Sequence, residues 1–345
     1  MSDKTLKARF LRLLQSCREP VLLSRLMEDI GSDISVRTAR RWLKEWADAG
    51  LVERTGENKG VRYRYCGVLK NHFRFLEGLD GDIRQSLLKQ IRDLWTHSST
   101  AMEGNTLSLE DTHFLLEEGL TVSGKPMKDH QEVLGHAQAI ALIYQMLDKP
   151  VSREDVFALH VAIQTAVVND IFKPNGAWKR EPNGTYVVTK AGARHFIEYA
   201  QPREVEKLMS EWIAALNYTG KKQLTLANAP ALYAMMHMGM VHIHPFWDGN
   251  GRMARLLANI PLLRAGLPPL MIPQEQRREY IQVLADYQLA VGQLTAETGV
   301  WPSGKYLKEF EVFCGNCYKG TIALVEEARA LQRGRREDGN PVSIG

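Results

Sequence analysis

The segment "HPFWDGNGRMAR", His244 to Arg255, places a histidine, a carboxylate, two glycines and two arginines close together. Pro245 ends the helix predicted for "ALYAMMHMGMVHI", because a residue that precedes proline disfavours the helical conformation. The spacing of "RMARLLANI" predicts a second helix. The loop "PFWDGNG" therefore opens a helix, and Gly249 and Gly251 let its backbone approach a ligand closely. Free N–H groups and the helix dipole make such a helix start an anion site.

Side chains around this loop provide the chemistry of phosphate-ester transfer. Asp248 can hold a magnesium ion that bridges phosphates, since magnesium favours carboxylate and phosphate oxygens. Arg252 and Arg255 add positive charge on the first turn of the helix. A neutral His244 can take a proton from a hydroxyl. We predict transfer of a phosphate ester to an alcohol.

The composition is that of a soluble globular protein with room for more than one domain, at 345 residues with 44% hydrophobic and 24% charged residues. Charges interrupt the apolar residues at the N-terminus, which argues against a signal peptide. No apolar run approaches the roughly 18 residues of a membrane span. Four cysteines do not suggest a disulfide scaffold. We expect a reduced, cytoplasmic protein without a membrane partner.

The positive charge is concentrated at the N-terminus. Residues 1–66 hold fourteen Lys and Arg against nine Asp and Glu, whereas the whole chain carries a net charge of only +4. Three helical segments, from "KARFLRLLQ" through "VLLSRLMEDIG" to "VRTARRWLKEWADAG", precede a basic hairpin, and this order resembles a winged helix-turn-helix. DNA binding and protein docking both remain open for it. The candidate DNA contacts lie on the third helix: Arg37, Arg40, Arg41 and Lys44.

The remaining chain is predicted to be mainly α. Helical apolar spacing recurs between about residue 70 and residue 333, and only "GTYVV" (184–188) reads as a strand, one arm of a small hairpin. We expect a winged helix-turn-helix at 1–67, linking and inhibitory helices at 68–130, a catalytic core with C-terminal helices at 131–333, and a flexible tail at 334–345.

At every defined position, "HPFWDGNGRMAR" resembles the signature of the Fic (filamentation induced by cAMP) family, H-P-F-x-[D/E]-G-N-[G/K]-R-x-x-R. The resemblance extends over roughly residues 95–330. It implies a helical Fic-fold bundle with a β-hairpin flap, and an enzyme that moves AMP from ATP to a Ser, Thr or Tyr hydroxyl of a protein. Members with lysine in place of Gly251 act as kinases, so glycine favours adenylyl transfer.

The resemblance also implies roles for single residues. His244 is the general base, Asp248 binds magnesium on the α- and β-phosphates, and Arg255 meets the γ-phosphate. The anion hole comprises Gly249, Asn250, Gly251 and Arg252. The flap edge that pairs with the target comprises Thr185, Tyr186, Val187 and Val188. The adenine pocket comprises Tyr280, Ile281, Leu284 and Gln288.

A second motif, Ser99-x-x-x-Glu103-Gly104, resembles the inhibitory pattern [S/T]-x-x-x-E-[G/N] of the same family. In members that carry it, the glutamate pairs with the second arginine of the signature, here Arg255. A carboxylate on that arginine takes the place of the γ-phosphate, so ATP is not held in line for attack. Ser99 is expected to hold the inhibitory helix through a hydrogen bond.

Several alternatives stay open at this level. The chain could be a DNA-binding regulator whose Fic core senses nucleotide, or a Fic-fold enzyme with another phosphate-ester donor. Some relatives also use the glutamate to remove AMP, and relatives often form homodimers. The sequence does not identify the target protein.

Overall fold

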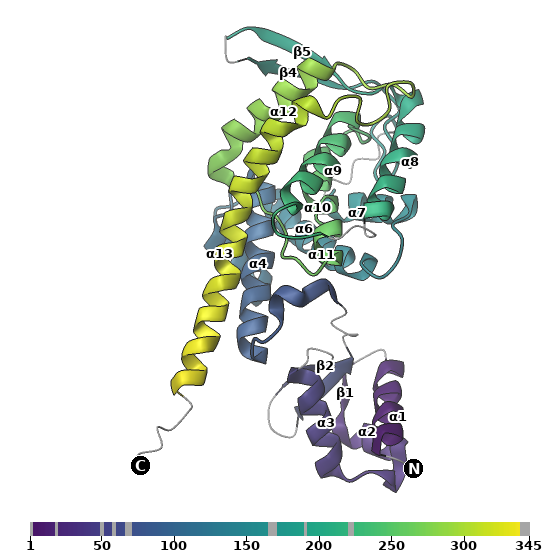
Figure 1. Ribbon diagram of the computed structural model, residues 1–345, viewed down its shortest axis with the longest axis vertical. Coiled ribbons are helices and arrows are strands. Elements are labelled where there is room, and N and C mark those ends of the chain that lie inside the picture. The colour runs from purple at the N-terminus through teal and green to yellow at the C-terminus, as the bar shows by residue number, and fades with distance from the viewer. Residues whose placement is uncertain are drawn as a thin grey trace. The chain divides into compact units, whose positions relative to one another are not determined.

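The computed structural model describes residues 3–17, 20–48, 52–56, 60–65, 71–164, 171–189, 192–219 and 224–338. The fold divides into two compact units, residues 1–85 with 328–345, and residues 86–327. The division falls within two long helices, α4 (Gly81–Ala101) and α13 (Lys308–Asp338). Helices predominate, as predicted (Figure 1). In the described part of the chain, none of the helices has the length and apolar character needed to cross a membrane.

The N-terminal segment contains three helices and a small sheet. The helices are α1 (Asp3–Ser16), α2 (Leu23–Ile30) and α3 (Val36–Asp48), and the strands are β1 (Val21–Leu22), β2 (Val52–Thr55) and β3 (Arg62–Tyr65). Strand β3 lies between β1 and β2 and is antiparallel to both. Apolar side chains of all three helices form its core, among them Phe10, Leu26, Trp42 and Trp46.

The helix predicted for "VLLSRLMEDIG" begins later than its apolar spacing suggested. Val21 and Leu22 are extended and pair with Tyr63 and Arg62 of β3, so α2 begins only at Leu23. Pairing with a strand distant in sequence overrides the local helical pattern here.

Helices also make up most of the second unit. Besides α4 and α13 they are α5 (Leu109–Glu118), α6 (Met127–Met146), α7 (Arg153–Ile163), α8 (Pro202–Thr219), α9 (Ala229–Ile243), α10 (Asn250–Leu257), α11 (Ile260–Arg264) and α12 (Arg277–Val291). Short 3-10 turns lie at Gly31–Asp33 and Asn71–Leu76 in the first unit, and at Gln274–Gln276 and Lys305–Leu307 in the second. Helix α9 is buried over most of its length and is contacted by α8, α10 and α11. It forms the rigid support of the glycine-rich loop.

The loop lies between α9 and α10. Helix α9 ends at Ile243, and His244 caps it in the left-handed conformation with φ 53° and ψ 57°. Helix α10 begins at Asn250, before the predicted start at Arg252, because Gly249 caps it with φ 78° and accepts the Met253 N–H at 2.9 Å. Two left-handed residues therefore set the path of the loop.

Two predicted helix ends differ from the structure. The helix expected for "RMARLLANI" ends at Leu257, and Ile260 begins the separate helix α11, whose first turn contains Pro261. Helix α13 continues past Arg333, where a flexible tail was expected, and ends at Asp338. Residues 339–345 of that expected tail lie outside the described residues.

The predicted strand "GTYVV" forms a hairpin. Strand β4 (Gly184–Val188) pairs antiparallel with β5 (Arg194–Glu198), with Thr185 opposite Ile197. The buried side chains of Val187 and Ile197 pack with Ala285 of α12, so the hairpin rests on that helix (Figure 1). We refer to residues 184–198 as the flap.

Candidate active site

His244 lies at the inner end of the flap. Its Nδ1 lies 3.1 Å from the Val241 carbonyl, so this nitrogen carries the proton and Nε2 keeps its lone pair. The imidazole stacks on the Tyr199 ring, with centroids 3.7 Å apart and planes 3° apart. Burial, followed by the nearby Lys179 cation, lowers the pKa of His244 to about 3. The ring is therefore neutral at pH 7 and can accept a proton.

Phe246 anchors the loop in the core. Its side chain is fully buried and stacks on the His160 ring at 3.8 Å. The Asn250 side chain accepts the Phe246 N–H and donates to the Phe246 carbonyl, both at 2.9 Å. The Asn250 amide is thus used to shape the loop, and only its backbone N–H remains for the predicted anion hole.

Helix α10 carries the two signature arginines in different environments. Arg252 lies in its first turn, but Arg255 lies in its last turn rather than in the first as predicted, because the helix begins two residues early. Arg252 donates to the Ile163 carbonyl at 3.0 Å and lies 3.5 Å from Asp248. The Asp248 side chain is 71% exposed. Burial raises its pKa, but Arg252 and the Gly249 N–H lower it more, so the pKa lies below the usual value. Asp248 is therefore an ionised carboxylate at the start of the helix.

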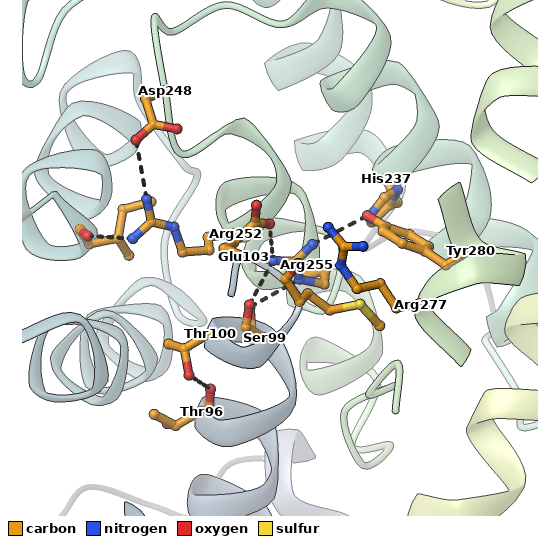
Figure 2. A network of polar contacts seen from close by, with 12 residues as sticks. Thr96, Ser99, Thr100, Glu103, His237, Asp248, Arg252, Arg255, Arg277 and Tyr280 are labelled. Carbon is orange, nitrogen blue, oxygen red and sulfur yellow. Dashed lines mark hydrogen bonds and ion pairs between the residues drawn. The ribbon is translucent and has the colours of Figure 1, made fainter. Parts of the chain in front are cut away.

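Arg255 binds the end of α4 rather than solvent (Figure 2). Its Nη2 donates to Glu103 Oε1 at 2.6 Å and to the Ser99 carbonyl at 2.8 Å, and its Nε donates to Ser99 Oγ at 3.0 Å. Arg255 is buried, whereas the Glu103 side chain is 42% exposed. Burial alone would lower the pKa of Arg255, but the Glu103 carboxylate raises it well above its usual value. Ser99 and Glu103 thus hold one guanidinium.

Gly251 makes room for this ion pair. A Cβ atom at Gly251 would lie 2.7 Å from Glu103 Oε1 and 3.1 Å from Arg255 Nη1. Arg255 Nη1 in turn lies 3.4 Å from the Tyr280 hydroxyl, whose oxygen is 3.0 Å from His237 Nε2. The carboxylate therefore sits directly against the predicted phosphate-binding turn.

A cavity of about 370 Å³ joins these groups. Its lining contains the predicted His244, Asp248, Gly249, Asn250, Gly251, Arg255, Glu103, Tyr280, Ile281, Leu284, Gln288, Thr185, Tyr186 and Val187. Of the residues predicted for the catalytic site, its inhibition and the flap, four do not line it. Ser99 and Arg252 are buried, Gly104 follows Glu103 in the turn, and Val188 lines a neighbouring groove. The lining also includes residues that sequence patterns missed: Met102, Tyr199, Val241, Arg277 and Ala285.

The donor set fits magnesium bound together with a phosphate. In the described part of the chain, no cluster of three or more His, Cys, Asp or Glu side chains could enclose a metal. Magnesium needs no such cluster, since it commonly takes one or two carboxylates and completes its shell with phosphate oxygens and water. The exposed Asp248 carboxylate offers that single ligand at the cavity wall.

Comparison with known proteins shows that the segment carrying this site is similar to a known family. Residues 150–262 match the family model described as Fic/DOC family. Curated relatives include Protein adenylyltransferase fic-1 of Caenorhabditis briggsae, 31% identical over 219 residues, and Protein adenylyltransferase Fic of Drosophila melanogaster, 35% identical over 192 residues. These matches cover 61% and 54% of this chain. They span only 39% and 36% of the relatives' own length.

Solved structures agree in fold. A Fic domain containing signaling protein from Bacteroides thetaiotaomicron has a TM-score of 0.64 at 27% identity, covering 76% of this chain and 96% of that chain. A glutamate-to-glycine variant of Fic-1 from Caenorhabditis elegans has a TM-score of 0.54 at 26% identity, covering 75% and 69%. The matched segment 150–262, which contains the whole loop from His244 to Arg255 and helices α8 to α10, is therefore similar to the Fic/DOC family.

Proposed function

We propose that the protein is an adenylyltransferase that moves AMP from ATP to a Ser, Thr or Tyr hydroxyl of a target protein, with its activity repressed by Glu103. One observation carries the proposal. A single cavity brings a neutral His244 imidazole, the Asp248 carboxylate and the N-terminus of α10 together with Arg255. A base, a magnesium ligand and an anion cradle are the groups that adenylyl transfer needs.

The reaction follows from the position of these groups. His244 Nε2 takes the proton of the target hydroxyl, and the hydroxyl oxygen forms a bond to the α-phosphorus of ATP. The bond between the α-phosphorus and the bridging oxygen breaks, and pyrophosphate leaves. The backbone N–H groups at Gly249–Gly251 bind the phosphate oxygens. Asp248 would hold magnesium beside this turn, and the ion would supply neutralisation of phosphate charge.

The wall formed by α12 supports a nucleotide base as ligand. Tyr280, Ile281 and Leu284 offer an apolar surface. Gln288 lines the same cavity and is buried, and its Nε2 has no hydrogen-bond partner among the residues that the structure describes. A buried amide without a partner costs free energy unless a ligand satisfies it. The edge of adenine offers both a donor and an acceptor for such an amide.

Repression is supported by the contacts of Arg255. The predicted partner of Arg255 is the γ-phosphate, yet its guanidinium donates to Glu103 and to Ser99. Glu103 Oε1 also lies against Gly251, in the phosphate cradle itself. Two anions cannot share that place without strong repulsion. ATP must therefore displace Glu103 before its γ-phosphate reaches Arg255. The same arrangement supports a second proposed activity, in which Glu103 acts as the base that activates water to remove AMP from the target.

The flap supports a protein as the second substrate. It forms a two-stranded sheet, and the Tyr186 and Val188 side chains of β4 are 62% and 61% exposed. An open strand edge beside the cavity can pair with the backbone of an extended target segment. Backbone pairing presents the target hydroxyl to His244 with little dependence on the target's side chains.

The N-terminal segment supports a separate docking role. The four basic residues predicted on α3, Arg37, Arg40, Arg41 and Lys44, are all exposed. We infer that this winged-helix-like segment, residues 1–67, binds duplex DNA or an acidic protein surface. The free thiols of Cys17, Cys314 and Cys317 suit a reducing compartment such as the cytoplasm.

The test compares α-labelled with γ-labelled ATP in the presence of magnesium. Glu103→Gly protein is expected to transfer label from the α position only, to itself or to lysate proteins, and native protein to transfer much less. His244→Ala in the Glu103→Gly background should lose transfer and keep ATP binding. Label from the γ position would indicate a kinase. No label from either position in Glu103→Gly would refute transfer, and equal labelling by native and Glu103→Gly protein would refute repression alone.

A further inference from the structure

The C-terminal end of α4 is held by two arginines, not one. After the last turn of α4, the Glu103 and Gly104 N–H groups donate to the Thr100 and Ala101 carbonyls at 3.0 Å. Two other carbonyls point outward. The Ser99 carbonyl accepts from Arg255, and the Met102 carbonyl accepts from Arg277 Nε at 2.8 Å. Carbonyls at a helix C-terminus carry partial negative charge, which a guanidinium stabilises.

Arg277 links this turn to the nucleotide wall. It is the first residue of α12, the helix that also carries Tyr280 and Gln288. It lines the same cavity as Glu103 and Arg255, and Figure 2 shows it beside the contacts of Arg255. Its side chain is exposed at the cavity rim, so the contact with Met102 is not imposed by close packing.

We propose that Arg277 is a positioning residue that holds the inhibitory turn Met102–Gly104 against α12 and so keeps Glu103 on Arg255. The inference rests on the repression proposed above. Glu103 is half exposed and reaches Arg255 from the turn that follows the C-terminal end of α4, where fraying is easiest. The charge-assisted hydrogen bond from Arg277 to the Met102 carbonyl limits that fraying. This hydrogen bond also persists when ATP competes for Arg255, because Arg277 does not take part in the ion pair between Glu103 and Arg255.

The first test is a comparison of two backgrounds. Arg277→Ala is expected to raise the rate of α-label transfer on the order of five- to tenfold in native protein, the size of one ordinary intramolecular hydrogen bond, because the exposed side chain is well solvated. In Glu103→Gly protein, which has no inhibitory carboxylate, the rise should be absent. The same fold-change in both backgrounds would overturn the proposal, since Arg277 would then act on the nucleotide. A rise in neither background would overturn it as well.

A matched control lies one residue away. Arg278 is exposed, carries the same charge and lines only the neighbouring groove. Arg278→Ala should leave the rate of native protein unchanged within about twofold. Arg277→Lys should restore part of the repression, because an ammonium group can also donate to the carbonyl.

The second test measures the local stability of the turn Met102–Gly104 and does not depend on enzymatic activity. Hydrogen exchange of the Glu103, Gly104 and Asn105 amides, which donate within the turn, should become about tenfold faster in Arg277→Ala and not in Arg278→Ala. Unchanged exchange in Arg277→Ala would overturn the positioning role. If exchange accelerates but Glu103→Gly is no more active than native protein, the positioning role stands and the proposed repression fails.

Discussion

The His244 imidazole lies flat on the Tyr199 phenol ring, 3.7 Å away between centroids and 3° from parallel. The imidazole is also tied through Nδ1 to the Val241 carbonyl. These two contacts leave Nε2 as the free nitrogen and set the direction of its lone pair. Tyr199 therefore orients the proposed base.

The stacked ring should matter through its shape rather than its hydroxyl. Tyr199→Ala, in the Glu103→Gly background, is expected to lower kcat on the order of ten- to a hundredfold, because a misplaced base loses its alignment with the hydroxyl. Tyr199→Phe should stay within about threefold. Steady-state kinetics should show a smaller change in KM for ATP than in kcat. Equal kcat for Ala and Phe would argue against orientation by the ring.

A control ring is available in the same core. Tyr287 lies edge-on to His242, with centroids 5.7 Å apart. His242 is buried and does not line the cavity. Tyr287→Ala should therefore lower stability and leave the kcat of the remaining folded protein close to that of the parent.

Asn250 should contribute to stability as well as to catalysis. Its side chain is the acceptor for the buried Phe246 N–H. Asn250→Ala leaves that N–H without a partner, at a cost of about 1–3 kcal/mol. The Phe246 carbonyl keeps a donor, because Asn183 Nδ2 also reaches it at 3.1 Å. Urea unfolding should reveal the loss, and an unchanged midpoint would mean that water replaces the side chain.

Stability should fall in mild acid because of buried neutral histidines. His136 is fully buried, neither ring nitrogen has a hydrogen-bond partner in the described part of the chain, and burial lowers its pKa to about 3. The unfolded chain binds a proton near pH 6.5 and the folded chain does not, so stability is lost as pH falls below 6.5. For His136 alone the loss is about 2 kcal/mol at pH 5.

His136→Leu isolates that contribution. Thermal unfolding at pH 7 and pH 5 should show a smaller acid shift in the variant than in native protein. The comparison between the two pH values removes any effect of the substitution on packing. Equal acid shifts would mean that His136 takes up a proton in the folded state.

Gln288 should determine affinity for the nucleotide base. Gln288→Leu, in the Glu103→Gly background, keeps the apolar volume and removes the amide that lacks a partner in the cavity. KM for ATP is expected to rise on the order of tenfold, with a smaller change in kcat, because the base is far from the bond that breaks. An unchanged KM would place the base elsewhere.

The basic face of α3 predicts salt-sensitive binding to DNA. Arg40→Ala/Lys44→Ala should weaken binding of the full chain to duplex DNA and reduce the slope of log affinity against log salt by about 2. Fluorescence anisotropy between about 50 and 200 mM salt measures both. No binding by native protein at low salt would favour an acidic protein partner instead.

Much of the fold could be predicted from local patterns. The proline after His244 ends α9, and the loop before α10 follows from its glycines. Helical spacing located most helices, because the pattern depends on residues three or four apart. The predictions were wrong or incomplete where residues distant in the sequence determine the local structure. Val21 and Leu22 join a strand, and strand β5, "RHFIE", has no alternation strong enough to show before its pairing with β4 is known.

The loop from His244 to Arg255 by itself predicted a phosphate-binding turn with a base and a magnesium ligand, because those groups are contiguous in the sequence. Only the tertiary structure decided what those groups touch. It brought Glu103 to Arg255 across 152 residues, Tyr199 under His244, and Arg277 to the Met102 carbonyl. Such contacts depend on how helices pack, and no local spacing records which side chains packing will bring together.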